Sequence, residues 1–139
     1  MRIRPACISD IDALMTIRAT VSENRLSNPA RVPRSDYLDF HRNSTLWICE
    51  TGGQVVGFSA CDPSNGSIWA LFVAPGREGS GCGRTLLARA CADLRRAGWS
   101  KACLTTGAGT RAERFYRRAG WQVFCEMSDG DLLLWRSLR

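Results

Sequence analysis

The sequence predicts an α/β domain built on a mixed, mostly antiparallel sheet with helices on both of its faces. Three consecutive strand-like runs are separated by short turn signals and predict an antiparallel meander: 45–50, 54–61 and 67–74. A long helical pattern joins the third run to the strand at 101–106, which is the connection that parallel strands require. The order βααβββαβαββ then places residues 1–139 in one domain.

The first element is a short strand at residues 2–6, and two helical patterns follow it. Ser9 is the expected N-cap of the first helix, and Ser35 is the expected N-cap of the second. Apolar side chains at helical spacing define their buried faces: Ile11, Leu14, Met15, Ile17 and Val21 in the first helix, and Tyr37, Leu38 and Phe40 in the second. The polar stretch 22–33 between them contains prolines that interrupt helical structure.

A third helix follows a glycine-rich segment and ends at Gly98, a residue type that is common just after a helix C-terminus. Its apolar stripe consists of Leu86, Leu87, Ala90, Cys91 and Leu94. The chain then closes with a helix at 110–118 and a strand pair, 121–127 and 131–138, joined by an Asp-Gly turn. No internal repeat or linker interrupts this pattern, which supports a single domain.

Length and composition indicate a globular protein. A chain of 139 residues buries about two-thirds of its unfolded surface, which is enough for a core without disulfides or metals. Apolar residues make up 45% and charged residues 23%, values that exclude intrinsic disorder. No apolar run approaches the roughly 18 residues of a membrane span, and the N-terminal residues lack the apolar core of a signal peptide. We therefore expect a cytoplasmic protein without a membrane partner.

The cysteine pattern gives no sign of a disulfide framework or a metal site. Seven cysteines are scattered singly, the number is odd, and no Cys-x-x-Cys pair occurs. His41 is the single histidine, so a zinc site would need ligands from distant strands. We expect no metal, and we expect most of the thiols to act as small buried hydrophobic groups.

A net charge of +6 is compatible with nucleic acid, an anionic membrane surface or a polyanionic cofactor. Arg111, Arg114 and Arg118 share one face of the helix at 110–118, which is either a solvated basic stripe or a surface that attracts phosphates. The aromatic residues of that helix are the single adjacent pair Phe115-Tyr116 and do not alternate with its arginines, and the chain has no zinc or helix-turn-helix signature. Nucleic acid is therefore not the expected partner.

The segment from Val73 to Leu87 reads as a strand, a glycine-rich turn and a helix start. Glycines at 79, 81 and 83 allow positive φ angles and close approach of a ligand, while the first N–H groups of the helix lack intrahelical partners. These donors and the helix dipole favour a phosphate. Cys82 stands where a P-loop needs lysine, and a dinucleotide fingerprint would need glycine at Arg84 or Leu86. The alternative is a tight turn without a ligand.

Two motifs resemble those of the GNAT acetyltransferases. The pattern from Glu78 through Gly83, followed by Leu86-Leu87, resembles the loop that holds the pyrophosphate of acyl-coenzyme A. Ala112-x-x-Phe115-Tyr116, closing at Gly120-Trp121, resembles the second signature of the family. The likeness extends loosely over nearly the whole chain. It implies the acyl-CoA N-acyltransferase fold, in which the strands 67–74 and 101–106 splay apart around the pantetheine arm of acetyl-CoA.

The resemblance also assigns residues to acetyl-CoA, the acetyl donor. Backbone N–H groups of Leu71, Phe72 and Val73 are expected to stabilise the oxyanion of the reacting thioester. The remaining expected coenzyme contacts are Glu78, Gly79, Ser80, Gly81, Cys82, Gly83, Arg84, Thr85, Arg111 and Phe115. Two departures from the family pattern stand out. Glu78 replaces a usual glutamine or arginine and should repel the pyrophosphate, and Gly109 replaces a frequent asparagine.

Tyr116 matches the tyrosine whose hydroxyl faces the sulfur in many members of the family. A phenol of reference pKa about 10 donates a full proton to a thiolate of about 8.5 at a cost of roughly 2 kcal/mol, so a hydrogen bond is the expected contribution. The alternative is a tyrosine that only packs beside Phe115. Glu23 is the expected general base, and other candidates are Asp36, His41, Glu50 and Asp62, or no base at all. Asn24, Arg25 and Tyr37 are expected to line the acceptor pocket.

The resemblance implies an N-acetyltransferase that moves an acetyl group from acetyl-CoA to a primary amine of a small molecule or peptide by direct attack on the thioester. One alternative is a catalytically idle domain that senses acyl-CoA, and a less favoured one is a basic nucleic-acid-binding protein. The terminal strands could pair between two copies to form a homodimer.

Overall fold

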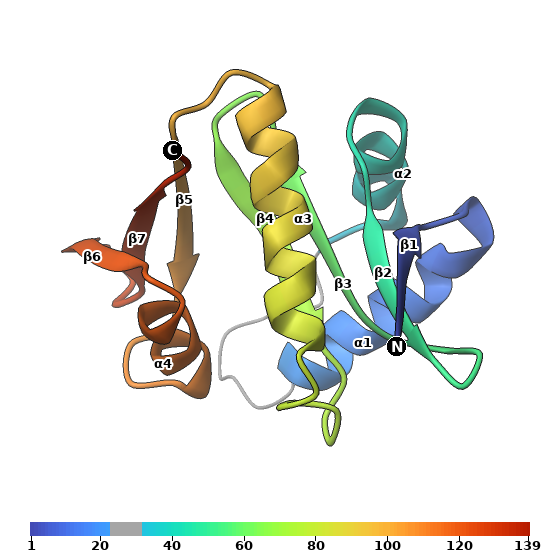
Figure 1. Ribbon diagram of the computed structural model, residues 1–139. Coiled ribbons are helices and arrows are strands. Elements are labelled where there is room, and N and C mark those ends of the chain that lie inside the picture. The colour runs from blue at the N-terminus through green and yellow to red at the C-terminus, as the bar shows by residue number, and fades with distance from the viewer. Residues whose placement is uncertain (23–31) are drawn as a thin grey trace.

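The computed structural model describes residues 1–22 and 32–139 (Figure 1). Its elements are β1 (Arg2–Pro5), the 3-10 turn η1 (Ile8–Asp10), α1 (Ile11–Ser22), α2 (Arg34–Asn43), β2 (Trp47–Thr51), β3 (Gln54–Asp62), β4 (Ser67–Val73), α3 (Cys82–Arg96), β5 (Lys101–Thr106), α4 (Arg111–Arg118), β6 (Gln122–Glu126) and β7 (Leu132–Ser137). Each predicted helix and strand is present, in the predicted order.

The strands of the described residues form one sheet in the order β1-β2-β3-β4-β5-β7-β6. The β2, β3 and β4 strands make the predicted antiparallel meander, and every other neighbouring pair is antiparallel except β4 with β5. Two-residue Gly-Gly and longer Gly-containing turns join the meander strands, because glycine takes positive φ angles without steric cost. The mixed, mostly antiparallel sheet is therefore confirmed.

Helices cover both faces of this sheet (Figure 1). On one face, apolar side chains of α1 and α2 pack against β2 and β3, and this core includes Ile11, Leu14, Tyr37, Ile48 and Phe58. On the other face α3 lies across the sheet, and its core includes Leu87, Ala90, Leu94, Leu104 and Leu134. Side chains of β4 belong to both cores, whereas the buried side chains of β5 belong only to the second.

The parallel pair β4 and β5 is joined only at its start. Ser67 pairs with Cys103, whose N–H donates to the carbonyl of Gly66 at 3.1 Å. Farther along, β4 stays paired with β3 as far as Val73, whereas β5 stays paired with β7 as far as Thr106. The two strands therefore diverge toward their carboxyl ends, and the predicted splay is confirmed.

Both predicted serine caps are wrong. Ser9 lies inside η1, and α1 begins only at Ile11. The turn is closed instead by the Asp10 carboxylate, which accepts from the N–H of Cys7 at 2.7 Å. At α2 the N-cap position is Pro33, whose φ of −71° suits the approach to a helix, and no side chain caps the first turn.

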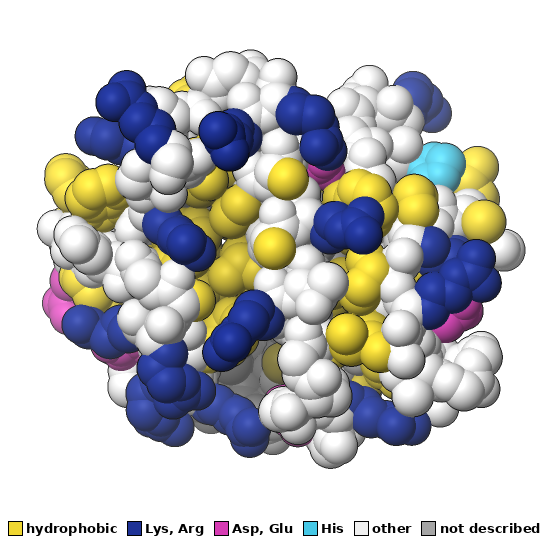
Figure 2. Space-filling view, in the orientation of Figure 1, with side chains coloured by type: hydrophobic (Ala, Val, Ile, Leu, Met, Phe, Trp, Pro, Cys, Tyr) yellow, Lys and Arg dark blue, Asp and Glu magenta, His cyan; other side chains and the backbone are white. Residues whose placement is uncertain are grey.

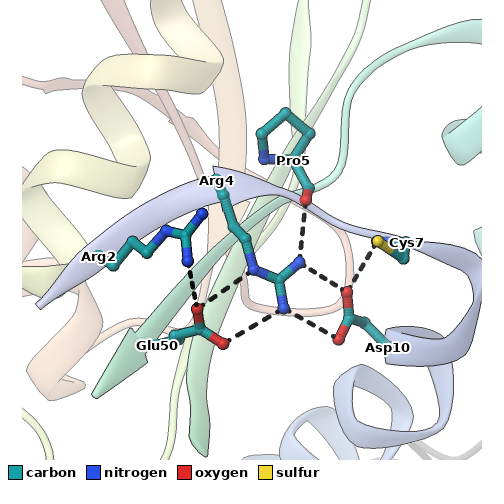
Figure 3. A network of polar contacts seen from close by, with 6 residues as sticks. All are labelled: Arg2, Arg4, Pro5, Cys7, Asp10 and Glu50. Atoms are coloured by element: carbon teal, nitrogen blue, oxygen red, sulfur yellow. Dashed lines mark hydrogen bonds and ion pairs between the residues drawn. The ribbon is translucent and has the colours of Figure 1, made fainter. Parts of the chain in front are cut away.

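An ion-pair network ties the N-terminal strand to the sheet (Figure 3). The guanidinium of Arg4 donates to Asp10 at 2.9 Å and to Glu50 at 3.3 Å, and Arg2 lies 3.7 Å from Glu50. The hydrogen bond from Arg4 is the main reason that the pKa of Asp10 lies below its ordinary value. Glu50, one of the candidate bases, is thus held in a structural network that joins β1, η1 and β2.

The seven cysteines are free thiols, and no cluster of potential metal ligands occurs in the described part of the chain. Among the same residues, no helix has the length and apolar character needed to cross a membrane.

Candidate functional site

A cleft of about 720 Å³ lies where β4 and β5 diverge, and the segment before α3, the helix α4 and α1 complete its walls. The predicted site residues that line it are Leu71, Phe72, Val73, Glu78, Gly79, Gly81, Gly83, Arg84, Arg111, Phe115 and Tyr116. The structure thus brings both sequence motifs to one cavity, although they lie about thirty residues apart in the chain.

Three side chains of the predicted coenzyme loop turn away from the cleft. Ser80 Oγ donates to the carbonyl of Arg77 at 2.9 Å, and Thr85 Oγ1 donates to the carbonyl of Gly81 at 3.0 Å. Cys82 is 1% exposed, and burial beside Cys49 raises the pKa of its thiol to about 12. These side chains stabilise the loop and the core, so any role in ligand binding falls to backbone groups.

Tyr37 does not line the cleft, so the expectation that it contacts the acceptor directly is not supported. It is 1% exposed and packs between Phe58, at 6.1 Å between ring centroids, and Trp69, at 5.2 Å. The sequence pattern also predicted that Tyr37 lies on the buried face of α2, and the structure confirms this core position. Glu23, Asn24 and Arg25 lie outside the described residues.

The N-terminus of α3 is open toward the cleft. Its N-cap Gly81 has a φ of +86°, no side chain caps the first turn, and no acidic residue lies in that turn. At α4, by contrast, Thr110 accepts from the N–H of Glu113 at 3.2 Å. The Glu113 carboxylate in turn accepts from the N–H of Gly109 at 2.7 Å, which is the main reason that its pKa is lowered. Free N–H donors therefore remain at α3, and these donors bind anions.

Arginines surround these donors. Arg84, in the first turn of α3, and Arg111 and Arg118 of α4 all line the cleft, and Figure 2 shows basic side chains around the apolar hollow between α3 and the β5–α4 side. Arg114 instead donates to the carbonyl of Gly109 at 3.4 Å. A cation at the positive end of a helix is unfavourable without an anion beside it. The arrangement suits a bound phosphate.

Glu78 also lines this end of the cleft, but its carboxylate is engaged within the loop. Oε1 accepts from the N–H of Gly76 at 2.8 Å. Gly76 has a φ of +84°, a backbone conformation that residues other than glycine rarely adopt. The Glu78 carboxylate closes the turn that contains this glycine. Glu78 therefore shapes the loop, while its charge still opposes an anion bound nearby.

The hydrogen-bond pattern of β4 indicates which of its backbone N–H groups face the gap. Ala74 donates to the carbonyl of Val56 at 2.7 Å, so this pair is hydrogen-bonded in the antiparallel ladder. Bonded positions alternate along a strand, and Phe72 is therefore bonded to β3 in the same way. The N–H groups of Leu71 and Val73 point to the opposite side, where β5 has moved away. Of the three N–H groups predicted to stabilise the oxyanion, those of Leu71 and Val73 are therefore available, and that of Phe72 is not.

Tyr116 forms part of the cleft wall with only 7% of its surface exposed. Its ring makes edge contacts with Phe115, at 5.4 Å between centroids, and with Trp121, at 5.8 Å. The neighbouring Phe115 ring limits the space at Gly83, where a Cβ would lie 3.6 Å from Phe115 Cζ and from Val73 Cγ2. The start of α3 and the aromatic side of α4 therefore form one continuous wall.

Two charged residues of the cleft were missed from the sequence. Asp131, just before β7, lines the cavity and joins Glu78 as its second described carboxylate. Arg18 of α1 also lines it, with Cζ 4.8 Å from the ring centroid of Phe72 and 5.3 Å from that of Trp69. Arg18 stands seven residues after Ile11 on the buried face of the helix, and that position was the available signal.

None of the other candidate bases within the described residues lines the cleft: Asp36, His41, Glu50 and Asp62. Asp62 accepts from the N–H of Ser64 at 3.0 Å and closes the turn after β3.

Comparison with known proteins gives a consistent result. The family model described as an acetyltransferase (GNAT) domain matches residues 42–123. A putative acetyltransferase from Salmonella typhimurium, yncA, solved with its cofactor acetyl-CoA, is 21% identical and has a TM-score of 0.81 over 100% of this chain and 94% of that one. Ribosomal-protein-alanine N-acetyltransferase from Brucella melitensis is 24% identical, with a TM-score of 0.78 over 99% of each chain.

The paia N-acetyltransferase from Thermoplasma acidophilum, solved with coenzyme A, has a TM-score of 0.79 at 15% identity over 98% of each chain. No curated protein sequence matches the chain. The likeness to the solved structures shows the shared fold, and the family model covers more than half of the sequence. The chain therefore belongs to the GNAT acetyltransferase family.

Proposed function

We propose that the protein is an N-acetyltransferase that moves an acetyl group from acetyl-CoA to a primary amine by direct attack on the thioester. The observation that carries the proposal is the open N-terminus of α3, which faces the same cleft as the splayed edge of β4. The cleft fits the coenzyme because it combines free backbone donors, arginines and a narrow apolar passage between two strands. Bound there, acetyl-CoA would supply an activated acyl group.

The diphosphate end of the coenzyme is assigned to the segment between Gly79 and Gly83. Positive φ angles at Gly79 and Gly81 turn the backbone so that a ligand can approach it closely, and no atom stands within 4 Å of where their Cβ atoms would be. Arg84 and Arg111 add charge from α3 and α4. Because no side chain of residues 1–22 or 32–139 caps α3, an anion here meets donors that this part of the chain leaves without a partner.

The chemistry is assigned to β4 and α4. The N–H groups of Leu71 and Val73 stabilise negative charge that develops on the carbonyl oxygen of the thioester, and one such donor is worth about 3 kcal/mol in a transition state. Tyr116 donates a hydrogen bond to the departing thiolate. Glu23 is assigned as the base that takes the proton of the amine, since none of the described alternatives lines the cleft: Asp36, His41, Glu50 and Asp62.

The test uses the purified protein, acetyl-CoA and a panel of primary amines. Coenzyme A release is followed by chromatography, because Cys7 is exposed and would react with a thiol reagent, and acetylated products are identified by mass. The proposal predicts acetyl transfer to at least one amine together with calorimetric binding of coenzyme A. Tight binding without transfer to any amine would favour the idle acyl-CoA sensor, and absence of binding would reject the site itself.

A further inference from the structure

We infer that the acceptor amine carries a carboxylate group and that Arg18 of α1 binds that carboxylate. The inference rests on the proposed function and names the substrate class of the same cleft: small amino acids with a free carboxylate. It is carried by the position of Arg18, by the lack of a carboxylate partner for its guanidinium among residues 1–22 and 32–139, and by the side from which an acceptor can reach the gap.

The Arg18 side chain is fixed at the cleft wall. Its guanidinium carbon lies 4.8 Å from the ring centroid of Phe72 and 5.3 Å from that of Trp69, a geometry that attracts a cation to aromatic faces. Burial raises the pKa of Tyr37, and the charge of Arg18 together with a hydrogen bond from its guanidinium to the phenol opposes that rise. Three aromatic side chains therefore hold the group before any ligand binds.

The charge of Arg18 has no opposite charge beside it in the described part of the chain. Nη1 is closed off from solvent and finds no hydrogen-bond acceptor there. Arg4, which is also partly enclosed, contacts the carboxylates of both Asp10 and Glu50, whereas no such ion pair holds Arg18 within residues 1–22 and 32–139. Removing a guanidinium from water without pairing it with an anion costs free energy, and a bound carboxylate offsets that cost.

Arg18 lies on the acceptor side of the reaction centre. The helix α1 covers the face of the sheet opposite to α3, where the coenzyme donors are (Figure 1). The ring of Phe72 contacts the Arg18 guanidinium. Phe72 lies between Leu71 and Val73, whose backbone N–H groups face the gap. An amine that enters from the α1 face therefore brings a group a few bonds away from its nitrogen next to Arg18.

The charge pattern of the cleft also argues against a polycationic acceptor. Its two described carboxylates are Glu78, which is hydrogen-bonded to Gly76, and Asp131 on the β7 side, whereas Arg18 faces the acceptor from α1. A guanidinium close to the substrate amine lowers the pKa of that amine and favours the neutral, nucleophilic form. The same charge repels a second ammonium group.

The experiment compares matched acceptors that differ only in the carboxylate. Glycine, alanine, serine, leucine, phenylalanine and glutamate are tested singly as free acids and as carboxamides, with kcat/KM measured for the protein and for Arg18→Gln, Arg18→Lys and Arg95→Gln. Arg95 is an exposed arginine outside the cleft and serves as the matched control. A second readout is calorimetric binding of N-acetylalanine and N-acetylalaninamide to the protein saturated with coenzyme A.

We expect at least one free acid to exceed its carboxamide in kcat/KM by about ten- to hundredfold, the range of a hydrogen-bonded charge pair. Arg18→Gln should abolish this preference, Arg18→Lys should restore part of it because it keeps the charge but loses the planar fork, and Arg95→Gln should retain it. The N-acetyl acid should bind more tightly than the amide, and only with Arg18 intact.

Equal kcat/KM for acids and amides would overturn the inference while acetyl transfer itself stands. A parallel loss for acids and amides in Arg18→Gln would also overturn it, because Arg18 would then act within the fold. If no compound is acetylated but the N-acetyl acid binds through Arg18, the carboxylate site at Arg18 stands and the proposed acetyl transfer fails.

Discussion

Replacing Arg84 with glutamine is expected to stabilise the free protein and to weaken its binding of acetyl-CoA. Arg84 lies in the first turn of α3, where the helix dipole is positive and no acidic side chain offsets it. A misplaced charge of this kind costs about 0.3–1 kcal/mol at an exposed site. For a domain of this size, removing it should raise the Tm of the free protein by about 1–4 °C.

The effect on the coenzyme has the opposite sign. Arg84 lines the cleft beside the open donors of α3, and a hydrogen bond from a charged group contributes about 1.5–3 kcal/mol. Because Arg84 is exposed, we expect the lower end of this range, a loss of about tenfold in affinity. Titration calorimetry with coenzyme A at two ionic strengths measures the loss, which should shrink as salt screens the charge.

Arg95→Gln provides a control on the same helix. Arg95 is exposed in the last turn of α3, at the negative end of the dipole, so its loss should lower the Tm of the free protein and leave coenzyme affinity unchanged. Scanning calorimetry of the two variants without ligand should therefore give shifts of opposite sign. A lower Tm for Arg84→Gln, or an unchanged affinity for coenzyme A, would refute the reasoning about the open helix.

Three further predictions concern other parts of the chain. Tyr116→Phe should lower kcat by about tenfold or more with little change in coenzyme affinity, and an unaltered kcat would remove the phenol from the mechanism. Glu78→Gln should tighten acetyl-CoA binding, because glutamine keeps the oxygen that accepts from Gly76 and loses the charge, whereas weaker binding in a titration would contradict it. Since Arg4 lowers the pKa of Asp10 below its ordinary 3.8, the ionised carboxylate stabilises the fold above that value and the stabilisation is lost as pH falls through the lower folded pKa. The free energy of unfolding, measured with denaturant, should thus fall at acid pH, and the fall should be smaller in Asp10→Asn. Identical pH profiles for the two proteins would contradict this prediction.

Local sequence signals predicted the elements of the fold but not how two of the helices begin. Strand runs and glycine turns report on neighbouring residues only, so the meander could be predicted. The start of α1 depends instead on Asp10 and on Arg4, which also bonds to Glu50 at 46 positions' separation. The Asp10 carboxylate, which Arg4 holds in place, accepts the hydrogen bond from Cys7 at this turn, and Ser9 does not cap the helix. A local sequence pattern does not report contacts between residues so far apart in the chain.

The proposed coenzyme wall and the proposed acceptor wall of the cleft differ in how well the sequence predicts them. The coenzyme wall uses backbone N–H groups, and these require glycines at fixed positions, such as Gly81 with its φ of +86°. This requirement leaves a recognisable motif in the chain. The proposed acceptor wall has side chains from α1 and β4, including Arg18 and Trp69, which line the cleft although they are far apart in sequence. Only the packing of α1 against the sheet brings them together.

This difference has a physical consequence for the whole protein. The sheet opens at one place because β4 and β5 share a single pairing, Ser67 with Cys103, and are then held by different neighbours. The proposed coenzyme face of that opening relies on backbone donors, and the nearby side chains of Arg84 and Glu78 adjust its affinity for the coenzyme. The other face combines Arg18 with aromatic rings that also pack in the core, so substitutions at Arg18 are expected to change the acceptor more than they change the donor site. Specificity for the acceptor is therefore expected to reside in α1 rather than in the glycine loop.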